Sequence, residues 1–210
     1  MIKQLCILTK SYKNGGYCVA GIDMETSRWM RLVSNDSGND EIPYEFMDKW
    51  QNRIEVLDIV EVEIIKTIPK NCQKENCLIN LEKPLKKIKS ITFEEILNFK
   101  GYDKRRNIFG NRGKAITPSD AELLSYSLIL IPVTNLQFSL IQNKDNYKWI
   151  CKDLTFTYND SVYTLPITDP EFKKEEYHNK QFSRASIVVS IPSEPYNEWH
   201  NKFVAKIFLI

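Results

Sequence analysis

Two closely spaced turn signals between positions 9 and 34 constrain this chain more than any other feature. Asn14-Gly15-Gly16 supplies the positive φ angles that a tight hairpin turn requires, and apolar runs of strand length flank it. Gly21, inside the second run, predicts a bulge or a bend, because glycine within a strand marks such positions. A polar turn at 23–27 then leads into a third strand at 28–33. We therefore expect this hairpin to found a small β-barrel.

The third strand carries a candidate binding pair. Its residues alternate, so Met30 and Leu32 share one face while Trp29 and Arg31 share the other. If Met30 and Leu32 face the core, Trp29 and Arg31 lie together at the surface. An exposed tryptophan beside an arginine suits base stacking and phosphate binding. The alternative is that Trp29 is buried and Arg31 pairs with a surface acid, since tryptophan is usually largely buried.

A second basic stretch spans Asp103 to Lys114. Gly110 and Gly113 loosen its backbone, and cations on such a loop can follow a phosphate chain. The alternative is a solvated surface loop, because charge runs are usually that. The cations of this stretch are Lys104, Arg105, Arg106, Arg112 and Lys114.

The remaining pattern predicts a mainly β fold with a minor helical part. Leu57 to Ile68 alternates as a long strand, and Tyr158 to Ser161 reads as a hairpin turn. Thr92 with Glu95 three residues later forms a capping box at the start of a helix. The two halves repeat this plan loosely. We expect two small β-barrels with about one helix each, at 1–126 and 127–210.

Composition narrows the class of protein. A net charge of +2 does not announce nucleic-acid binding by itself, although a local patch still provides a field. No apolar run approaches the roughly 20 residues of a membrane helix, and the N-terminus does not resemble a signal peptide. Five cysteines, an odd number in mostly apolar patterns, favour reduced thiols. We expect a cytoplasmic protein without a membrane partner.

Few residues point to catalysis. The chain has no Walker A loop, no GxGxxG, no HExxH and no GxSxG. Cys72 and Cys77 are the only close cysteine pair, and with two histidines in the chain they make a poor zinc site. We therefore assign no catalytic residue, metal or cofactor. An enzyme that uses carboxylates and bound Mg²⁺ stays open, although no spacing indicates one.

Eight segments of the chain carry a family resemblance: 10–11, 15–22, 29–33, 73–79, 108–111, 127–131, 165–170 and 203–207. Together they resemble the dual OB-containing domain family of bacterial proteins, which are often associated with anti-phage and other conflict systems. The resemblance spans nearly the whole chain and implies two OB-like barrels with a nucleic-acid or nucleotide-binding role. It supplies no catalytic residues. Leu32 stands where we expect proline, and Cys77 stands where the family has an aromatic residue.

These observations predict a nucleic-acid-binding module, for a single strand or RNA rather than duplex DNA. The expected contacts on one side of the site are Lys10, Tyr12, Lys13, Arg28, Trp29 and Arg31, with Arg105, Arg106, Arg112 and Lys114 opposite. One alternative is a sensor of a small nucleotide or modified base, in a closed pocket near Arg31, Glu75 and Asn76, because buried polar groups need a ligand or each other. Another is a non-enzymatic subunit that regulates a protein encoded nearby.

Overall fold

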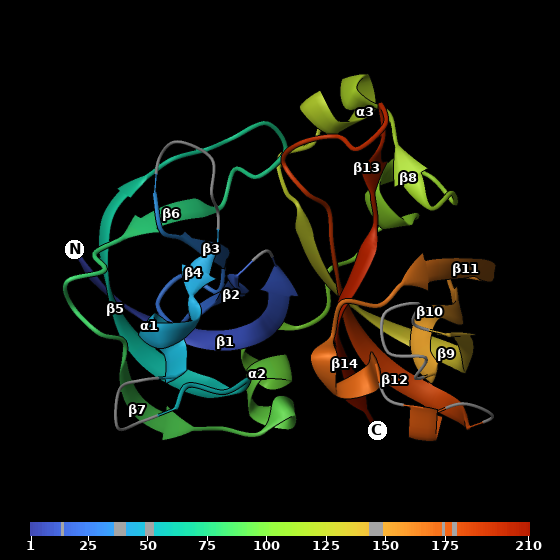
Figure 1. The fold of residues 1–210 in the computed structure, drawn as a ribbon, viewed down its shortest axis with the longest axis horizontal. Coiled ribbons are helices and arrows are strands. Elements are labelled where there is room, and N and C mark those ends of the chain that lie inside the picture. Colours follow the sequence, from blue (N-terminus) through green and yellow to red (C-terminus); the bar gives the residue numbers. More distant parts are fainter. Residues whose placement is uncertain (14, 36–40, 49–52, 143–148, 174, 178–179) are drawn as a thin grey trace. The chain divides into compact units, whose positions relative to one another are not determined.

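The computed structural model describes the chain except residues 14, 36–40, 49–52, 143–148, 174 and 178–179. Backbone contacts divide it into two compact units, Met1–Gly101 and Tyr102–Ile210, which we describe separately (Figure 1). Strands dominate both, so the mainly β prediction is confirmed.

Five strands of the first unit close into a barrel. They follow one another in the order β1-β2-β3-β6-β5, and β5 pairs back onto β1. All these pairings are antiparallel except that of β3 with β6. This closed five-stranded ring is the OB barrel. The strands are β1 (Ile2–Lys13), β2 (Gly16–Asp23), β3 (Trp29–Val33), β5 (Asp58–Thr67) and β6 (Asn76–Ile79).

Short elements border this barrel. Strand β4 (Ile42–Pro43) pairs with β2, and β7 (Lys86–Ser90) pairs with β5. Helix α1 (Tyr44–Asp48) follows β4. Helix α2 (Phe93–Lys100) begins at the expected capping box, in which Thr92 and Glu95 exchange side-chain and backbone hydrogen bonds.

The register between β1 and β2 explains why glycine stands at position 21. The pairing shifts between Ile7 and Thr9, opposite Gly21 and Ala20, which is the bulge that the sequence predicted. A Cβ atom added to Gly21 would lie 2.0 Å from the carbonyl oxygen of Cys6. Only glycine lets the two backbones approach this closely.

The second unit repeats the same ring. Its strands follow the order β11-β10-β9-β12-β14, and a parallel bridge between Ile167 and Val204 joins the end of β11 to β14. Phe156 and Tyr163 pair across β10 and β11 and stack at 5.7 Å in the core. The strands are β9 (Leu128–Gln142), β10 (Trp149–Tyr158), β11 (Ser161–Pro166), β12 (Gln181–Ser190) and β14 (Phe203–Leu209).

Smaller elements of this unit support its loops. A two-stranded ribbon pairs β8 (Ala115–Ile116) with β13 (His200–Asn201), as Figure 1 shows. Helix α3 (Pro118–Glu122) follows β8, and 3₁₀ turns lie at Ile108–Gly110, Pro170–Lys173 and Glu175–Tyr177.

Residues 102–126 lie with the second unit, whereas the sequence prediction assigned them to the first domain. Hydrogen bonds explain the difference. The Tyr102 hydroxyl lies 2.7 Å from the Ser186 hydroxyl, and the Leu130 amide donates to Asp103 at 2.7 Å. These partners lie far along the chain, so local sequence patterns do not reveal them.

Candidate nucleic-acid interface

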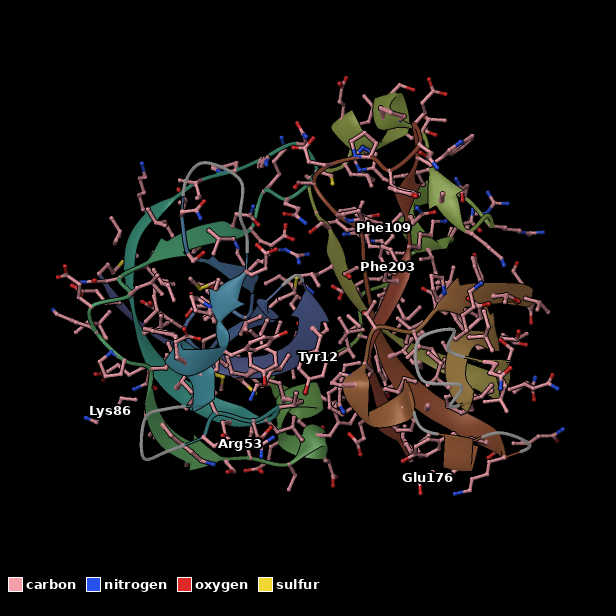
Figure 2. The ribbon with its side chains drawn as sticks, viewed as in Figure 1. Tyr12, Arg53, Lys86, Phe109, Glu176 and Phe203 are labelled. Atoms are coloured by element: carbon pink, nitrogen blue, oxygen red, sulfur yellow. The ribbon has the colours of Figure 1, made fainter. Side chains whose placement is uncertain are left out.

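Tyr12 presents an exposed ring at the end of the first hairpin. It pairs with Tyr17 across β1 and β2, and the two rings stack at 5.4 Å. Tyr44 packs edge-on against both. The Tyr12 side chain is 56% exposed, and Figure 2 labels it. Because Tyr17 and Tyr44 hold one side of the ring, Tyr12 is a preorganised aromatic surface. Lys13 ends β1, and its side chain lies outside the described part of the structure.

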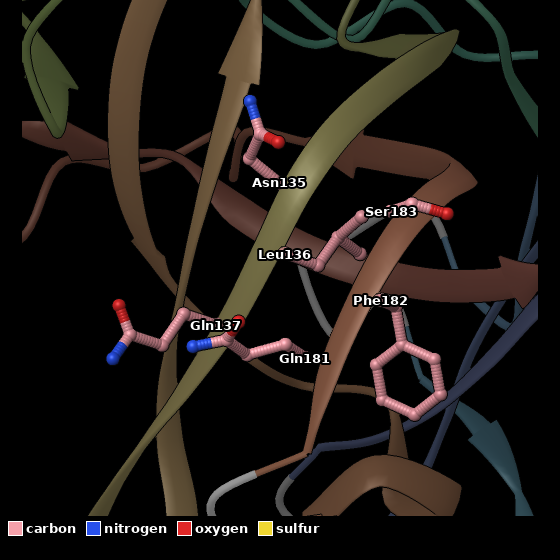
Figure 3. A pocket seen from close by; sticks show the side chains of 6 residues that line it. All are labelled: Asn135, Leu136, Gln137, Gln181, Phe182 and Ser183. Atoms are coloured by element: carbon pink, nitrogen blue, oxygen red, sulfur yellow. The ribbon is translucent and has the colours of Figure 1, made fainter.

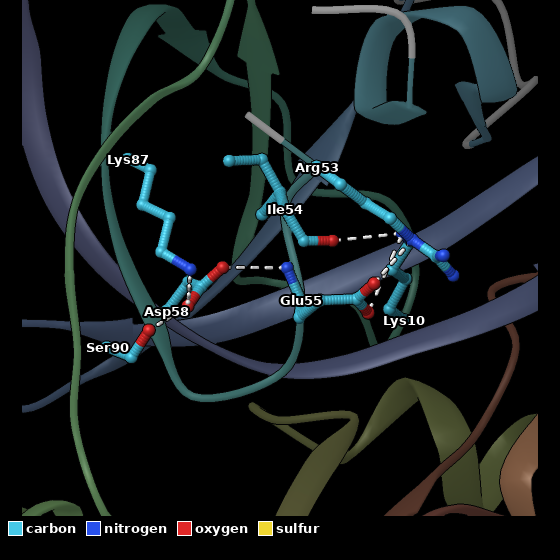
Figure 4. Close-up of polar contacts among 7 residues, drawn as sticks. All are labelled: Lys10, Arg53, Ile54, Glu55, Asp58, Lys87 and Ser90. Carbon is cyan, nitrogen blue, oxygen red and sulfur yellow. Dashed lines mark hydrogen bonds and ion pairs between the residues drawn. The ribbon is translucent and has the colours of Figure 1, made fainter. Parts of the chain in front are cut away.

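Lys10 does not lie at the surface, which corrects its expected role as a phosphate contact. Its side chain is only 7% exposed, and its ammonium lies 4.5 Å above the Tyr17 ring. The Nζ atom donates to the Ile54 carbonyl at 2.9 Å and lies 4.0 Å from a Glu55 carboxylate oxygen (Figure 4). The register explains this position, because Lys10 pairs with Val19, a residue of the barrel core.

Strand β3 bears out only part of the expected arrangement. Met30 and Leu32 face the core, as predicted. Arg28 is exposed, and Trp29 is half-buried with the Lys100 ammonium 5.5 Å above its ring. Arg31 is on the face opposite the core but is only 6% exposed, so Trp29 and Arg31 do not form a surface pair. Alternation identifies the face of a strand and does not tell whether that face is covered.

Arg31 instead belongs to a buried polar cluster. Its backbone amide donates to the Glu75 carbonyl at 2.9 Å, and its Nη2 lies 3.6 Å from a Glu75 carboxylate oxygen. Arg31 pairs with Asn76 in the parallel β3–β6 ladder, and Asn76 Nδ2 donates to Gln73 at 3.2 Å. The structure therefore brings together the three residues of the predicted pocket, and they contact each other.

Burial also changes the pKa of two cysteine thiols near this cluster. It raises the pKa of Cys72 and of Cys77 to about 11, so both are thiols at neutral pH. All five cysteines of the chain are free. Among the described residues, no group of three or more cysteine, histidine or acidic side chains is arranged to hold a metal ion.

The basic stretch of the second unit presents its charges to solvent. Its backbone is fixed: the Arg105 carbonyl accepts from the Tyr158 hydroxyl at 2.5 Å and from the Asn159 side-chain Nδ2 at 2.8 Å. Phe109, labelled in Figure 2, is buried and stacks on Tyr126. These contacts hold the loop against the β10–β11 turn. The five side chains that the loop exposes are Lys104, Arg105, Arg106, Arg112 and Lys114.

One of these cations is less available than the others. The Arg105 guanidinium lies 4.1 Å above the Tyr126 ring, on the ring that Phe109 also contacts. The far end of the loop is held by Lys202, a fully buried residue whose Nζ donates to the Asn111 carbonyl at 2.9 Å and to its side-chain oxygen at 2.6 Å. Lys104, Arg106, Arg112 and Lys114 are therefore the better candidates for phosphate contacts.

The outer face of β10 and β11 is open. Side chains of this face alternate with the core residues Leu154, Phe156 and Tyr163 and are exposed or half-buried. Its cross-strand pair Thr155 and Thr164 is half-buried, with the two hydroxyl oxygens 3.0 Å apart. The equivalent face of the first unit, on β2 and β3, is buried at Ala20 and Arg31. The face that OB barrels use for oligonucleotides is thus accessible in the second unit. The half-exposed or exposed residues of the open face are Asp153, Thr155, Thr157, Val162, Thr164 and Pro166.

A depression of about 460 Å³ lies between β9 and β12 (Figure 3). Asn135, which bulges out of β9 with a φ of 55°, forms one of its walls. The described residues of its lining offer carboxamides and no charged side chain, so none of them gives a phosphate a cation. The lining residues are Asn135, Leu136, Gln137, Gln181, Phe182 and Ser183.

Two exposed aromatic residues of the second unit are not among the predicted contacts. Tyr196 and Trp199 are both exposed and lie on a turn between β12 and β13. The local signal for this turn is weak, because only Asn197 of its two central residues favours a positive φ angle. The two predicted sets, Lys10 to Arg31 and Arg105 to Lys114, lie in different units. The single site that they were expected to share stays a prediction.

Two OB barrels in one chain, one of them with a fixed cationic loop, define the class: a double OB-fold protein. Comparison with protein-family models is more specific. Residues 3–207 match the family described as Dual OB-containing domain, and the chain belongs to that family. Searches among curated proteins and among solved structures gave no match. No helix in the described part of the chain has both the length and the apolar character needed to cross a membrane.

Proposed function

We propose that this protein binds single-stranded nucleic acid, RNA or DNA, through the exposed cations of the 104–114 loop. One observation carries the proposal: five basic side chains point to solvent from a loop whose backbone is hydrogen-bonded to the β10–β11 turn. A fixed loop loses little conformational entropy on binding, and each neutralised phosphate releases counterions. The loop borders the open β10–β11 face, along which a strand could extend.

The test is fluorescence anisotropy with labelled single-stranded DNA, RNA and duplex DNA at several salt concentrations. We expect the single strands to bind more tightly than the duplex. For single strands, the slope of log K against log salt is about −0.7 per phosphate contact. Replacing Arg106 and Arg112 by alanine therefore reduces the steepness by about 1.4 and weakens binding. The matched control is Lys86→Ala with Lys89→Ala, which removes the same charge from exposed positions of β7. Absence of binding by the wild-type protein to every strand would overturn the proposal.

A second candidate function is the sensing of a small nucleotide or modified base at the Arg31–Glu75–Asn76 cluster. Asn76 supports it, because its side chain is 1% exposed and its Oδ1 atom has no hydrogen-bond partner among the described residues. A buried acceptor left in this state costs roughly 1–3 kcal/mol, which a ligand donor would recover. A thermal-shift screen with mononucleotides tests this idea. A nucleotide that stabilises the wild type but not Asn76→Leu favours the pocket, and length-dependent binding of strands favours the loop.

The cellular setting is part of the same proposal. Family membership supports a role in a bacterial conflict system, and five free thiols fit a reducing compartment such as the cytoplasm. A stable complex with a protein encoded nearby, without any nucleic-acid affinity, would favour an interaction subunit instead.

A further inference from the structure

The turn that carries Tyr196 and Trp199 is a small hairpin of its own. The two residues form an antiparallel bridge, in which the Tyr196 amide donates to Trp199 at 2.8 Å and the Trp199 amide donates back at 3.1 Å. Between them, Asn197 and Glu198 have φ angles of 48° and 66°. Positive φ at both central residues is the mark of a type I′ turn. Residues directly opposite in such a pair project from the same face.

Both aromatic side chains face solvent. Tyr196 is 72% exposed and Trp199 is 48% exposed, whereas Phe156 and Tyr163 of the same unit are buried in its core. Exposure of two large rings on one face of a turn leaves apolar area in contact with water, and this area is recovered when a flat apolar group stacks on the rings. The turn is therefore built to contact a ligand with planar rings.

The segments on both sides of the turn are tied to the unit. On one side, the Ile191 amide donates to the Ser127 carbonyl at 3.0 Å, and the His200 ring contacts the Pro192 carbonyl at 2.9 Å. On the other, His200 and Asn201 pair with β8. Since the backbone is held in this way, the rings lose little freedom on binding.

The same ribbon leads from the rings to two cations of the 104–114 loop. The Lys202 amide donates to the Lys114 carbonyl at 2.9 Å, so Lys114 lies opposite Lys202. Trp199 precedes Lys202 by three residues, and a rise of about 3.3 Å per residue puts Trp199 about 10 Å along the ribbon from Lys114. Arg112 is two positions before Lys114 in the chain, next to Asn111, which accepts hydrogen bonds from Lys202. The rings and these two cations therefore lie on one ribbon, about 10 Å or more apart along it.

The ligand class follows from this chemistry. Rings for stacking together with cations for phosphates match single-stranded nucleic acid, in which bases and phosphates alternate. We infer that Tyr196 and Trp199 form a base-stacking pair for the strand whose phosphates contact Arg112 and Lys114. This inference rests on the proposed function and names where the bases bind. Glu198 is exposed on the same turn. Its negative charge repels the phosphates of the strand and so lowers the affinity for nucleic acid.

Alanine variants of the pair test the inference directly. Stacking of one base contributes roughly 1–3 kcal/mol, so Trp199→Ala and Tyr196→Ala should each raise the Kd for a labelled dT12 or rU12 strand about 5- to 150-fold. The salt slope should not change, because no phosphate contact is lost. The control is Phe99→Ala, which removes an exposed ring from α2 in the other unit. Thermal melts establish that each variant is folded.

A strand without bases separates this inference from the proposed function. An abasic 12-mer keeps its phosphates, so the wild type and Trp199→Ala should bind it equally. Stacking of a base on Trp199 should also quench the tryptophan fluorescence of the wild type when dT12 is added. The variant Trp199→Phe should lose this quenching and retain most of the affinity for dT12. If the wild type binds dT12 and both alanine variants bind as tightly, the stacking pair is wrong and the proposed function stands. If the wild type binds no strand, the proposed function fails with it. An acidic aromatic peptide that binds through Tyr196 and Trp199, with no binding of dT12, would assign the surface to a protein partner and overturn the inference.

Discussion

Replacing Arg31 by methionine tests whether the buried cluster of the first unit is structural. Its guanidinium lies 3.6 Å from the Glu75 carboxylate, and the two side chains are 8% and 7% exposed. At an effective dielectric constant of about 20, this separation corresponds to an attraction of about 5 kcal/mol, much of which offsets the cost of burying the charges. Arg31→Met removes the attraction and leaves the carboxylate buried, so we expect a loss of about 3–5 kcal/mol.

Urea unfolding measures this loss, and hydrogen exchange of the β3 and β6 amides assigns it to the first unit. Arg28→Met, an exposed neighbour, should change stability by less than about 0.5 kcal/mol. The double variant Arg31→Met with Glu75→Leu removes both charges and should be more stable than Arg31→Met alone. A loss below about 1 kcal/mol for Arg31→Met, or a double variant as unstable as the sum of the singles, would refute this reasoning.

Three further outcomes are expected. Gly21→Ala should destabilise the first unit by about 3 kcal/mol or more in urea unfolding, since its Cβ would lie 2.0 Å from the Cys6 carbonyl oxygen, and a neutral result would contradict the bulge geometry. Burial lowers the pKa of Lys202 from 10.5 to about 8. Between pH 8 and pH 10.5 the unfolded chain binds more protons at Lys202 than the folded chain, so the contribution of Lys202 to stability rises with pH, by about 3 kcal/mol in total. The unfolding free energy of the wild type minus that of Lys202→Met should therefore increase by that amount over this pH range. A difference that does not change with pH would refute the lowered pKa. Glu198→Gln should tighten binding of a single strand at low salt but not at high salt, and equal Kd values at low salt would place Glu198 away from the ligand.

The sequence predicts the parts of this fold that depend on neighbouring residues. The capping box at Thr92, the turn after Tyr158 and the bulge at Gly21 each follow from backbone angles or hydrogen bonds within a few positions, and the structure has all three. The strands follow from alternation for the same reason. Two barrels, rather than one larger sheet, also follow from short strands with frequent turn signals.

The exposure of individual site residues depends on distant parts of the chain. Lys10 and Arg31 stand in strands where alternation gives only a face, and their burial depends on Ile54 and Glu75, more than 40 positions away. The loop at 104–114 belongs to the second unit because its backbone is hydrogen-bonded there. The Tyr158 hydroxyl accepts from the Arg105 amide, and the Asn159 side chain donates to the Arg105 carbonyl. A local sequence pattern does not reveal such distant partners. It therefore does not tell whether a basic or aromatic residue in a strand is exposed or buried.

The two barrels share one topology but offer different surfaces, which bears on where a ligand binds. In the first unit the outer face of β2, β3 and β6 is buried at Ala20, Arg31 and Asn76. Buried groups cannot stack bases or reach phosphates, so this face suits at most a small enclosed ligand. In the second unit the corresponding face is open, a fixed cationic loop borders it, and an exposed aromatic pair lies on the loop between its fourth and fifth barrel strands. OB barrels bind oligonucleotides with that face and that loop, so the second barrel has the surface that the proposed strand-binding site needs, and the first does not.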